Sequence, residues 1–356
     1  MALHFAGKTM SQQPIHNVPT NIITGFLGVG KTSAILHLLT QKPAHERWAI
    51  LVNEFGEIGI DKTLFEGQLT ADSGVFIREV PGGCMCCAAS LPMQIALNQL
   101  LAASRPHRLL IEPTGLGHPK EVMQVLTAEH YQTVLSIQKT LTLVDARKLS
   151  DERYTQHDTF NQQLGIADVI VANKCDLYSD QDKVRLQQYV AAHCQPDTII
   201  VQTQYGQLSL DILEGRATNY AQPHQPQHDP SHAHHHKHEH AGNDSSNTLA
   251  ADQDLPAIGI LSANNKGEGF ISTGWRFSPD IVFDHSALKT CLSALRAERL
   301  KGVFITNNGV FGYNLTDDGL TEMLLDDCEE SRVEVIATDI PDSLEVQLTA
   351  CFLLSK

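Results

Sequence analysis

A phosphate-binding loop near the start of the chain limits the folds that the rest can adopt. Residues 25–32, GFLGVGKT, fit the pattern G-x-x-x-x-G-K-[ST]. A short apolar run at 21–24 precedes the loop, and a segment with helical spacing at 33–41 follows it. This strand–loop–helix context predicts a P-loop nucleotide-binding site within an α/β fold.

The residues of this loop have separate expected roles. Glycines allow the backbone to approach phosphate oxygens closely, and the following helix adds its positive N-terminal end. Lys31 is expected to contact the outer phosphates, and the Thr32 hydroxyl is expected to hold Mg²⁺. The residues predicted to bind nucleotide here are Gly25, Gly28, Val29, Gly30, Lys31, Thr32 and Ser33.

Apolar runs alternate with helical segments between about residues 20 and 205. Buried-strand patterns occur at 48–52, 75–80, 108–112, 141–145, 168–173 and 198–202. The alternation predicts a doubly wound, mostly parallel sheet with helices on both faces. Ligands of such sheets bind beyond the carboxyl ends of the strands, and every motif described here lies at such an end.

Composition changes sharply near residue 215, which predicts a domain boundary. Residues 221–251 are rich in polar residues and Pro, and eight histidines lie between 224 and 240. Strand-like pieces at 275–277, 281–283, 303–305, 309–311 and 333–336, with a helix at 285–300, predict a small α+β domain. The predicted parts are a flexible N-terminus (1–19), a P-loop GTPase domain (20–220), a His-rich disordered linker (221–254) and a C-terminal domain (255–356).

Charge and composition argue against several functional classes. The formal net charge of −15 argues against a nucleic-acid or anionic-membrane surface. No run of 18 apolar residues is present, and the first 17 residues do not resemble a signal peptide. Three of the eight cysteines crowd into four positions, which argues against a disulfide framework. A cytoplasmic protein is expected, and Met10 is a second candidate start.

The segment Asn173-Lys174-Cys175-Asp176 fits N-K-x-D at a strand end and predicts guanine specificity. The Asp176 carboxylate can accept hydrogen bonds from N1–H and the N2 amine of guanine, whereas adenine presents an acceptor at N1. Asn173 is expected to tie this segment to the phosphate loop, and Lys174 to lie along the base and sugar. The expected nucleotide is therefore GTP, which argues against a small-molecule kinase.

A second strand end supplies the expected switch. Glu112, at the end of the strand 108–112, can hold Mg²⁺ through water, and the Gly115 amide can sense the γ-phosphate. The predicted catalytic residues are Lys31, Thr32, Glu112 and Gly115. Asp145 is expected to be structural. The sequence shows no strong water-positioning group, so slow intrinsic turnover is expected.

Cys84, Cys86 and Cys87 form the expected transition-metal site. Three thiols within four residues, at a predicted helix N-terminus, favour thiolates that bind Zn²⁺ or a similar ion. Glu57 or a water molecule could supply a fourth ligand. A redox pair or buried small side chains are the alternatives. The histidine tract could bind Zn²⁺, Ni²⁺, Co²⁺ or Cu²⁺ loosely, or be a solvated linker.

The order of five segments resembles that of the CobW-type metallochaperone GTPases. The segments are the phosphate loop, Asn53-Glu54-Phe55-Gly56, the segment 82–87, Glu112-Pro113-Thr114-Gly115 and the N-K-x-D segment. The runs 112–119 and 82–87 are most similar to the zinc-binding YeiR-like branch. The resemblance implies GTP hydrolysis coupled to metal handling at the C-x-C-C thiolates, with 53–61 as a switch. A client metalloprotein is an implied partner, and a homodimer is left open.

The leading hypothesis is a GTPase that binds zinc and passes it to a client protein. Delivery of cobalt or nickel on the same scaffold is an alternative, because thiolates also bind those ions. A zinc store or buffer that uses the histidine tract is another.

Overall fold

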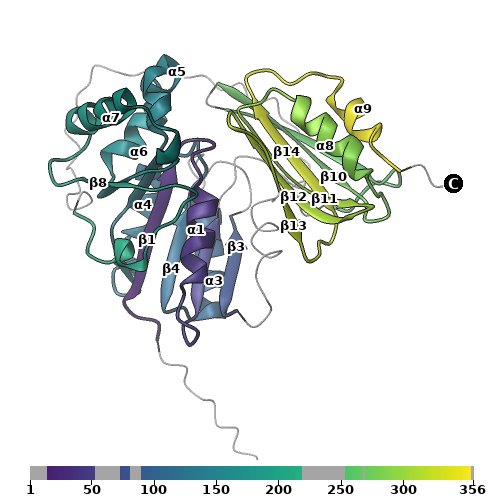
Figure 1. Ribbon diagram of the computed structural model, residues 1–356. Helices are drawn as coiled ribbons and strands as arrows, with labels where there is room; N and C mark the ends of the chain where they lie inside the picture. Colours follow the sequence, from purple (N-terminus) through teal and green to yellow (C-terminus); the bar gives the residue numbers. More distant parts are fainter. Residues whose placement is uncertain (1–13, 53–72, 81–89, 219–252, 268, 354–356) are drawn as a thin grey trace, which may run out of the picture.

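The computed structural model describes residues 14–52, 73–80, 90–218, 253–267 and 269–353, and the first three ranges form an α/β unit (Figure 1). Its central sheet has eight strands in the order β3-β2-β4-β1-β6-β7-β8, and β5 also pairs with β1. All of the strand pairs are parallel. The predicted doubly wound parallel sheet is confirmed. The strands are β1 (Val18–Gly25), β2 (Trp48–Val52), β3 (Val75–Glu79), β4 (Arg108–Glu112), β5 (Leu135–Ile137), β6 (Leu141–Val144), β7 (Val169–Ala172) and β8 (Ile199–Gln202).

Helices cover both faces of this sheet because the buried strands are apolar on both sides. Neighbouring residues of β1 show the division: Ile23 belongs to one core and Ile22 to the other. The first core includes α1, α6 and α7, and the second includes α3 and α4. The helices are α1 (Lys31–Thr40), α3 (Ser90–Ser104), α4 (Pro119–Leu126), α5 (Glu152–Thr155), α6 (Asp158–Gly165) and α7 (Asp180–His193), with 3₁₀ turns η1 (Glu129–Tyr131), η2 (Ala146–Ser150), η3 (Cys175–Leu177) and η4 (Leu210–Leu213).

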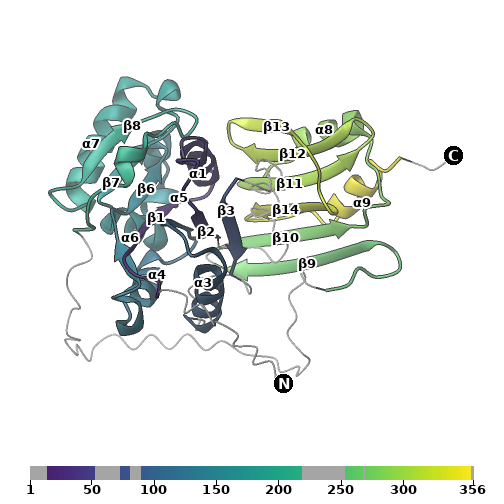
Figure 2. The same ribbon diagram turned by 90° about the horizontal axis from the view of Figure 1, so that it is seen from below.

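The second unit is a six-stranded antiparallel sheet in the order β13-β12-β11-β14-β10-β9. Two helices, α8 and α9, cover the face of this sheet that is turned away from the first unit (Figures 1 and 2). Leu288 and Leu348 from these helices pack on Phe277 and Phe304 of the sheet. The elements are β9 (Ile260–Gly267), β10 (Phe270–Phe277), α8 (His285–Ala294), β11 (Arg299–Thr306), β12 (Gly309–Thr316), β13 (Gly319–Leu325), β14 (Ser331–Ala337) and α9 (Leu344–Thr349).

Three sequence predictions are wrong in detail. Strand β1 begins at Val18, inside the predicted flexible N-terminus, because Val18 is buried and pairs with Leu135. The predicted helix 285–300 ends at Ala294, since Arg299 already belongs to β11. The predicted strand 281–283 is reduced to isolated bridges at Phe283, whose ring packs edge-on against Phe277 and Phe304.

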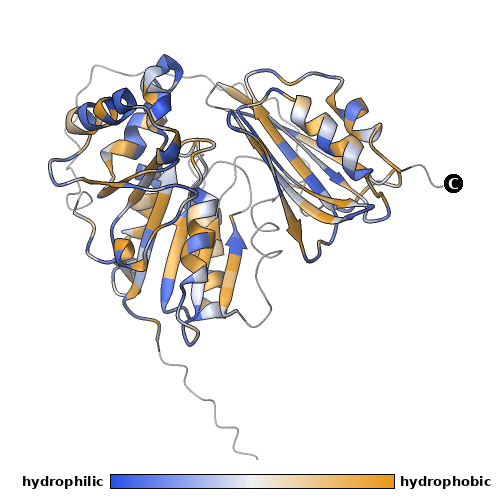
Figure 3. Cartoon of the chain, viewed as in Figure 1, coloured by the Kyte–Doolittle hydropathy of each residue, from blue (hydrophilic) through white to orange (hydrophobic). Residues whose placement is uncertain are grey.

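Hydropathy follows these layers (Figure 3): the inner strands of the first sheet are hydrophobic, whereas α7 is largely hydrophilic. An aromatic cluster joins the two units. The ring centroid of Phe26 lies 5.0 Å from that of Tyr154, 4.9 Å from that of His157 and 6.5 Å from that of Phe270 on β10. Within the part of the chain that the structure describes, no helix combines the length and apolar character needed to cross a membrane.

Candidate functional site

The predicted phosphate loop connects β1 to α1 and depends on glycine at two positions. Gly25 has φ +140°, and a Cβ atom there would lie 2.4 Å from the carbonyl oxygen of Leu143. Gly30 has φ +96°, and a Cβ atom there would lie 2.5 Å from Nδ2 of Asn173. Both positions combine a left-handed backbone with close neighbours, so any side chain would push the loop away from the sheet edge.

Lys31 lies under the loop, with only 6% of its surface exposed. Its ammonium donates hydrogen bonds to the carbonyl oxygens of Gly25 at 3.0 Å and Phe26 at 3.3 Å. These contacts hold the charge on the inner side of the loop. Ser33, in the first turn of α1, is exposed.

Thr32 and Glu112 meet where β1 and β4 end side by side. The Thr32 hydroxyl donates a hydrogen bond of 2.9 Å to Oε1 of Glu112, whose side chain is 3% exposed. An ammonium group, from Lys301 of β11, donates to the same hydroxyl at 3.0 Å. A partly buried position with two oxygen atoms that already accepts a cation fits the ligand preference of Mg²⁺.

Gly115, three residues beyond β4, lies against the phosphate loop. A Cβ atom at Gly115 would lie 2.8 Å from Cδ2 of Leu27 and 3.1 Å from the carbonyl carbon of Phe26. The structure therefore places Gly115 against the phosphate loop, which also carries Lys31 and Thr32, two of the other residues predicted to be catalytic.

The segment 173–176 begins where β7 ends, beside β6. Nδ2 of Asn173 donates to the carbonyl oxygen of Val29 at 2.8 Å, and Oδ1 accepts from the backbone N–H of Gly206 at 3.0 Å. Asn173 thus joins the phosphate loop to the loop after β8. Lys174 adopts φ +61°, and Asp176 is exposed within η3.

Replacing Asn173 by Ala is expected to lower the free energy of unfolding by about 2–4 kcal/mol, because two buried backbone groups would lose their partner. Asn173 is 2% exposed, so water cannot replace the amide without rearrangement. Urea unfolding measures the change. Asn308→Ala is the control: Asn308 is exposed, and its side-chain amide contacts the His285 ring. A loss no larger for Asn173→Ala than for this control would contradict the assignment.

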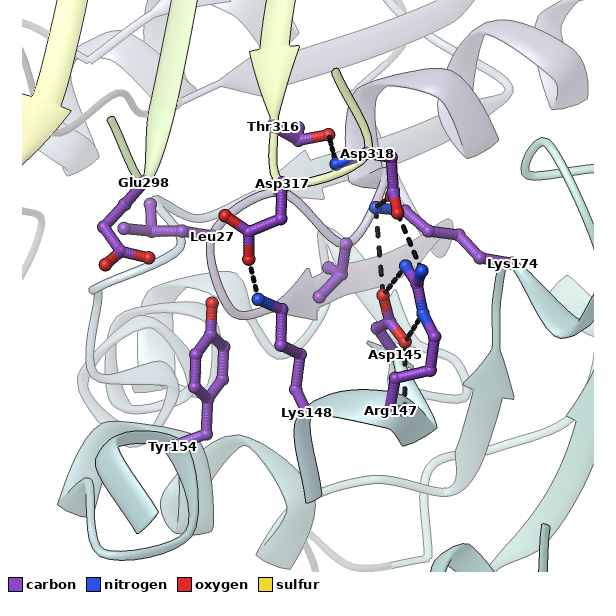
Figure 4. A pocket seen from close by; sticks show the side chains of 12 residues that line it. Leu27, Asp145, Arg147, Lys148, Tyr154, Lys174, Glu298, Thr316, Asp317 and Asp318 are labelled. Carbon is purple, nitrogen blue, oxygen red and sulfur yellow. Dashed lines mark hydrogen bonds and ion pairs between the residues drawn. The ribbon is translucent and has the colours of Figure 1, made fainter. Parts of the chain in front are cut away.

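A small pocket beside the loop contains residues from both units (Figure 4). The β12–β13 hairpin inserts Asp318, which forms ion pairs with Arg147 at 2.7 Å and with Lys174 at 2.5 Å. Burial would raise the pKa of Asp318, but hydrogen bonds from Arg147 and Lys174 outweigh it and lower the pKa to about 2. Asp145 accepts from Arg147 at 2.6 Å and caps η2, in agreement with its expected structural role.

Sequence reasoning missed Lys301, Asp318 and Arg147. None belongs to a motif, and the first two lie in a different unit from the phosphate loop. The only sequence signal is weak: Asp317 and Asp318 occupy a turn between two strand-like runs.

The residues predicted to bind a transition metal lie outside the described residues: Glu57, Cys84, Cys86, Cys87 and the histidine tract. Within residues 14–52, 73–80, 90–218, 253–267 and 269–353, no cluster of three or more His, Cys, Asp or Glu side chains could hold a metal ion. The five cysteines of these ranges are free thiols. Burial raises the pKa of Cys194 to about 11, so this thiol is not a thiolate at neutral pH.

Comparison with known proteins identifies relatives along most of the chain. The CobW/HypB/UreG nucleotide-binding domain matches residues 19–202. The zinc chaperone YeiR of Escherichia coli is 39% identical over 332 residues, which cover 91% of this chain and 94% of YeiR. The zinc chaperone YjiA of the same organism is 32% identical over 174 residues, 47% of this chain and 52% of YjiA. The structure of this chain also aligns with the crystal structure of Zn(II)-bound YjiA GTPase from Escherichia coli. The alignment covers 95% of this chain and 99% of the YjiA chain, with 18% sequence identity and a TM-score of 0.42.

The matches to the domain and to YeiR agree with the geometry of the phosphate loop. The domain match begins at the second residue of β1 and ends at the last residue of β8, so it includes all eight strands of the parallel sheet except Val18. The match to YeiR extends across both units. The chain therefore belongs to the CobW/HypB/UreG family of P-loop GTPases.

Proposed function

We propose that the protein is a GTP-hydrolysing zinc chaperone that couples binding and hydrolysis of Mg²⁺–GTP to binding and transfer of Zn²⁺. The observation that supports this most is the meeting of three motifs at one sheet edge. Lys31 and Thr32 follow β1, Glu112 ends β4, and Asn173 follows β7 while bonding to the loop after β1. The name of the relative YeiR, a zinc chaperone, supports zinc as the cargo.

In the proposed reaction the chain's own residues position and neutralise the phosphates. The Lys31 ammonium, which now contacts the loop carbonyls, would turn to the outer phosphate oxygens. Thr32 and Glu112 would hold Mg²⁺, which when bound neutralises charge on those phosphates. The Gly115 amide, against the loop, would contact the γ-phosphate. We propose that Asp176 selects guanine and that Lys174 lies along the base.

The cargo would be held by the thiolates of Cys84, Cys86 and Cys87, with Glu57 as a candidate fourth ligand. Three thiolates and an exchangeable fourth ligand suit an ion that must be released. We propose that the conformation of the loops around Asn53 and Gly115 depends on the presence of the γ-phosphate. Hydrolysis would then lower the affinity for zinc and permit transfer to a client metalloprotein. Coupling of about 5- to 150-fold in zinc affinity between nucleotide states is typical of such linkage.

Asp176→Asn is expected to change the preferred base from guanine to xanthine. The carboxylate accepts from the N2 amine of guanine, whereas an amide can donate to the carbonyl oxygen that xanthine carries there. We expect affinity for GDP to fall by roughly 100-fold or more, with affinity for xanthosine diphosphate rising. Competition against a fluorescent guanine nucleotide measures both.

Asp180→Asn is the matched control, because Asp180 is exposed and its carboxylate contacts Lys183 on the outside of α7. Equal loss of affinity for every base in the Asp176 variant would show that Asp176 supports the fold rather than recognition. Absence of guanine-nucleotide binding by the unaltered protein would exclude the proposed function.

A further inference from the structure

We propose that Lys301, from the C-terminal sheet, is a further residue of the nucleotide site and competes with Mg²⁺ for the position between Thr32 and Glu112. The inference rests on the proposed function, because it concerns how the same site accepts Mg²⁺ and nucleotide. It assigns the C-terminal unit a direct part in that site.

The contact that supports this proposal joins two distant parts of the chain. Nζ of Lys301 lies 3.0 Å from Oγ1 of Thr32, and Oγ1 in turn donates to Oε1 of Glu112 at 2.9 Å. Thr32 and Glu112 are the two residues proposed to hold Mg²⁺. The ammonium of Lys301 therefore contacts an oxygen atom that is proposed to be a Mg²⁺ ligand.

An ammonium and Mg²⁺ that contact the same hydroxyl oxygen repel each other. Mg²⁺ binds oxygen ligands at about 2.0–2.1 Å, so an ion on the Thr32 hydroxyl would lie close to an ammonium 3.0 Å from the same oxygen. Repulsion between like charges at such distances is strong at a buried site. Lys301 is 7% exposed and Glu112 is 3% exposed, so little water is available to screen the two charges. We therefore expect Mg²⁺ to displace the ammonium.

The fold holds Lys301 in place for this competition. Lys301 lies within β11, an inner strand that pairs with both β12 and β14. The adjacent β12–β13 hairpin is fixed to the first unit by ion pairs of Asp317 with Lys148 and of Asp318 with Arg147 and Lys174. Glu298, just before β11, pairs with Arg153 at 3.0 Å. The Lys301 ammonium thus extends from a strand that is fixed against the first unit, and not from a flexible surface segment.

The test is a Mg²⁺ titration of fluorescent GDP binding by the full-length protein and by Lys301→Met. Met keeps most of the aliphatic length but has no charge, so we expect the half-saturating Mg²⁺ concentration to fall by about tenfold, the scale of one charge-assisted hydrogen bond. Lys301→Arg keeps the charge and should resemble the unaltered protein. Lys266→Met, at an exposed position of β9, is the control for loss of a lysine from this sheet.

A second measurement needs no substitution. In the unaltered, GDP-loaded protein, labelling of Lys301 by an amine-reactive reagent is expected to rise several-fold when Mg²⁺ is added, while labelling of Lys266 stays constant. Mass spectrometry assigns the labelled lysines. Unchanged labelling of Lys301 would overturn the proposal even if Lys301→Met failed to fold.

The outcomes separate this inference from the proposed function. If Lys301→Met binds GDP but needs the same or more Mg²⁺ than the unaltered protein, the competition is overturned and the GTPase assignment stands. If the unaltered protein binds no guanine nucleotide at any Mg²⁺ concentration, both are overturned. A lower Mg²⁺ requirement in Lys301→Met alone, with Lys301→Arg unchanged, supports the proposal.

Discussion

Lys31→Ala is expected to lower the rate of GTP hydrolysis by about 100- to 1000-fold, the usual effect of removing one preorganised charge or donor from a transition state. The ammonium is buried under the loop and would lie next to the outer phosphates, where negative charge is concentrated. No neighbouring residue of the loop carries a charge that could replace it. Phosphate release from GTP under single-turnover conditions measures the effect.

Lys120→Ala is the control for the Lys31 variant, because Lys120 is exposed on α4. Circular dichroism must show that both variants fold, since Lys31 also bonds to two loop carbonyls. A folded Lys31→Ala protein that hydrolyses GTP at the unaltered rate would remove the loop from the reaction.

Replacing Cys84, Cys86 and Cys87 together by Ser is expected to weaken Zn²⁺ binding by more than about 100-fold. Loss of groups that only orient a metal ligand already costs about 10- to 100-fold, and hydroxyls are poor zinc ligands compared with thiolates. Competition with a chromophoric chelator, in the presence of GDP and of a slowly hydrolysed GTP analogue, measures the affinity in both states.

Cys328→Ser is the matched control for the triple variant. Burial raises the pKa of Cys328 to about 11, so this thiol is protonated at neutral pH and should not bind zinc tightly. Unchanged zinc affinity in the triple variant would show that the ion binds elsewhere, with the histidine tract as the first alternative. Deleting residues 221–250 would then distinguish a zinc store from a chaperone.

The parallel sheet was predictable because its signals are local. Strand β2 matches the predicted segment Trp48–Val52 residue for residue. A short, wholly apolar run bounded by polar residues is typical of a fully buried strand. The phosphate loop was predictable for the same reason, because its glycines, lysine and threonine are adjacent in sequence.

The second unit was harder to predict, because its strands carry mixed patterns. Strand β9 has the sequence ILSANNKG, in which five of the eight residues are polar or glycine, so its low apolar content does not mark it as a strand. The sequence pattern predicts too long a helix here because Leu295 and Leu300 continue its apolar spacing, although α8 ends at Ala294 and Leu300 is buried within β11.

The contacts between the two units could not be predicted from one sequence. Lys301 and Thr32 are separated by 269 positions, and Asp318 and Lys174 by 144. Neither Lys301 nor Asp318 lies in a recognisable motif. Packing of the two units brings these side chains together, so the C-terminal part of the site is visible only in the structure.

The ring of Phe26 connects the phosphate loop to both units through packing contacts. Phe26 belongs to the loop itself, yet its ring packs among Tyr154, His157 and Phe270 of both units. Closely packed interiors have low compressibility and transmit small displacements. A shift of the loop of a few tenths of an ångström would therefore move rings on α5 and β10, and a nearby tyrosine would report the event in its ultraviolet spectrum.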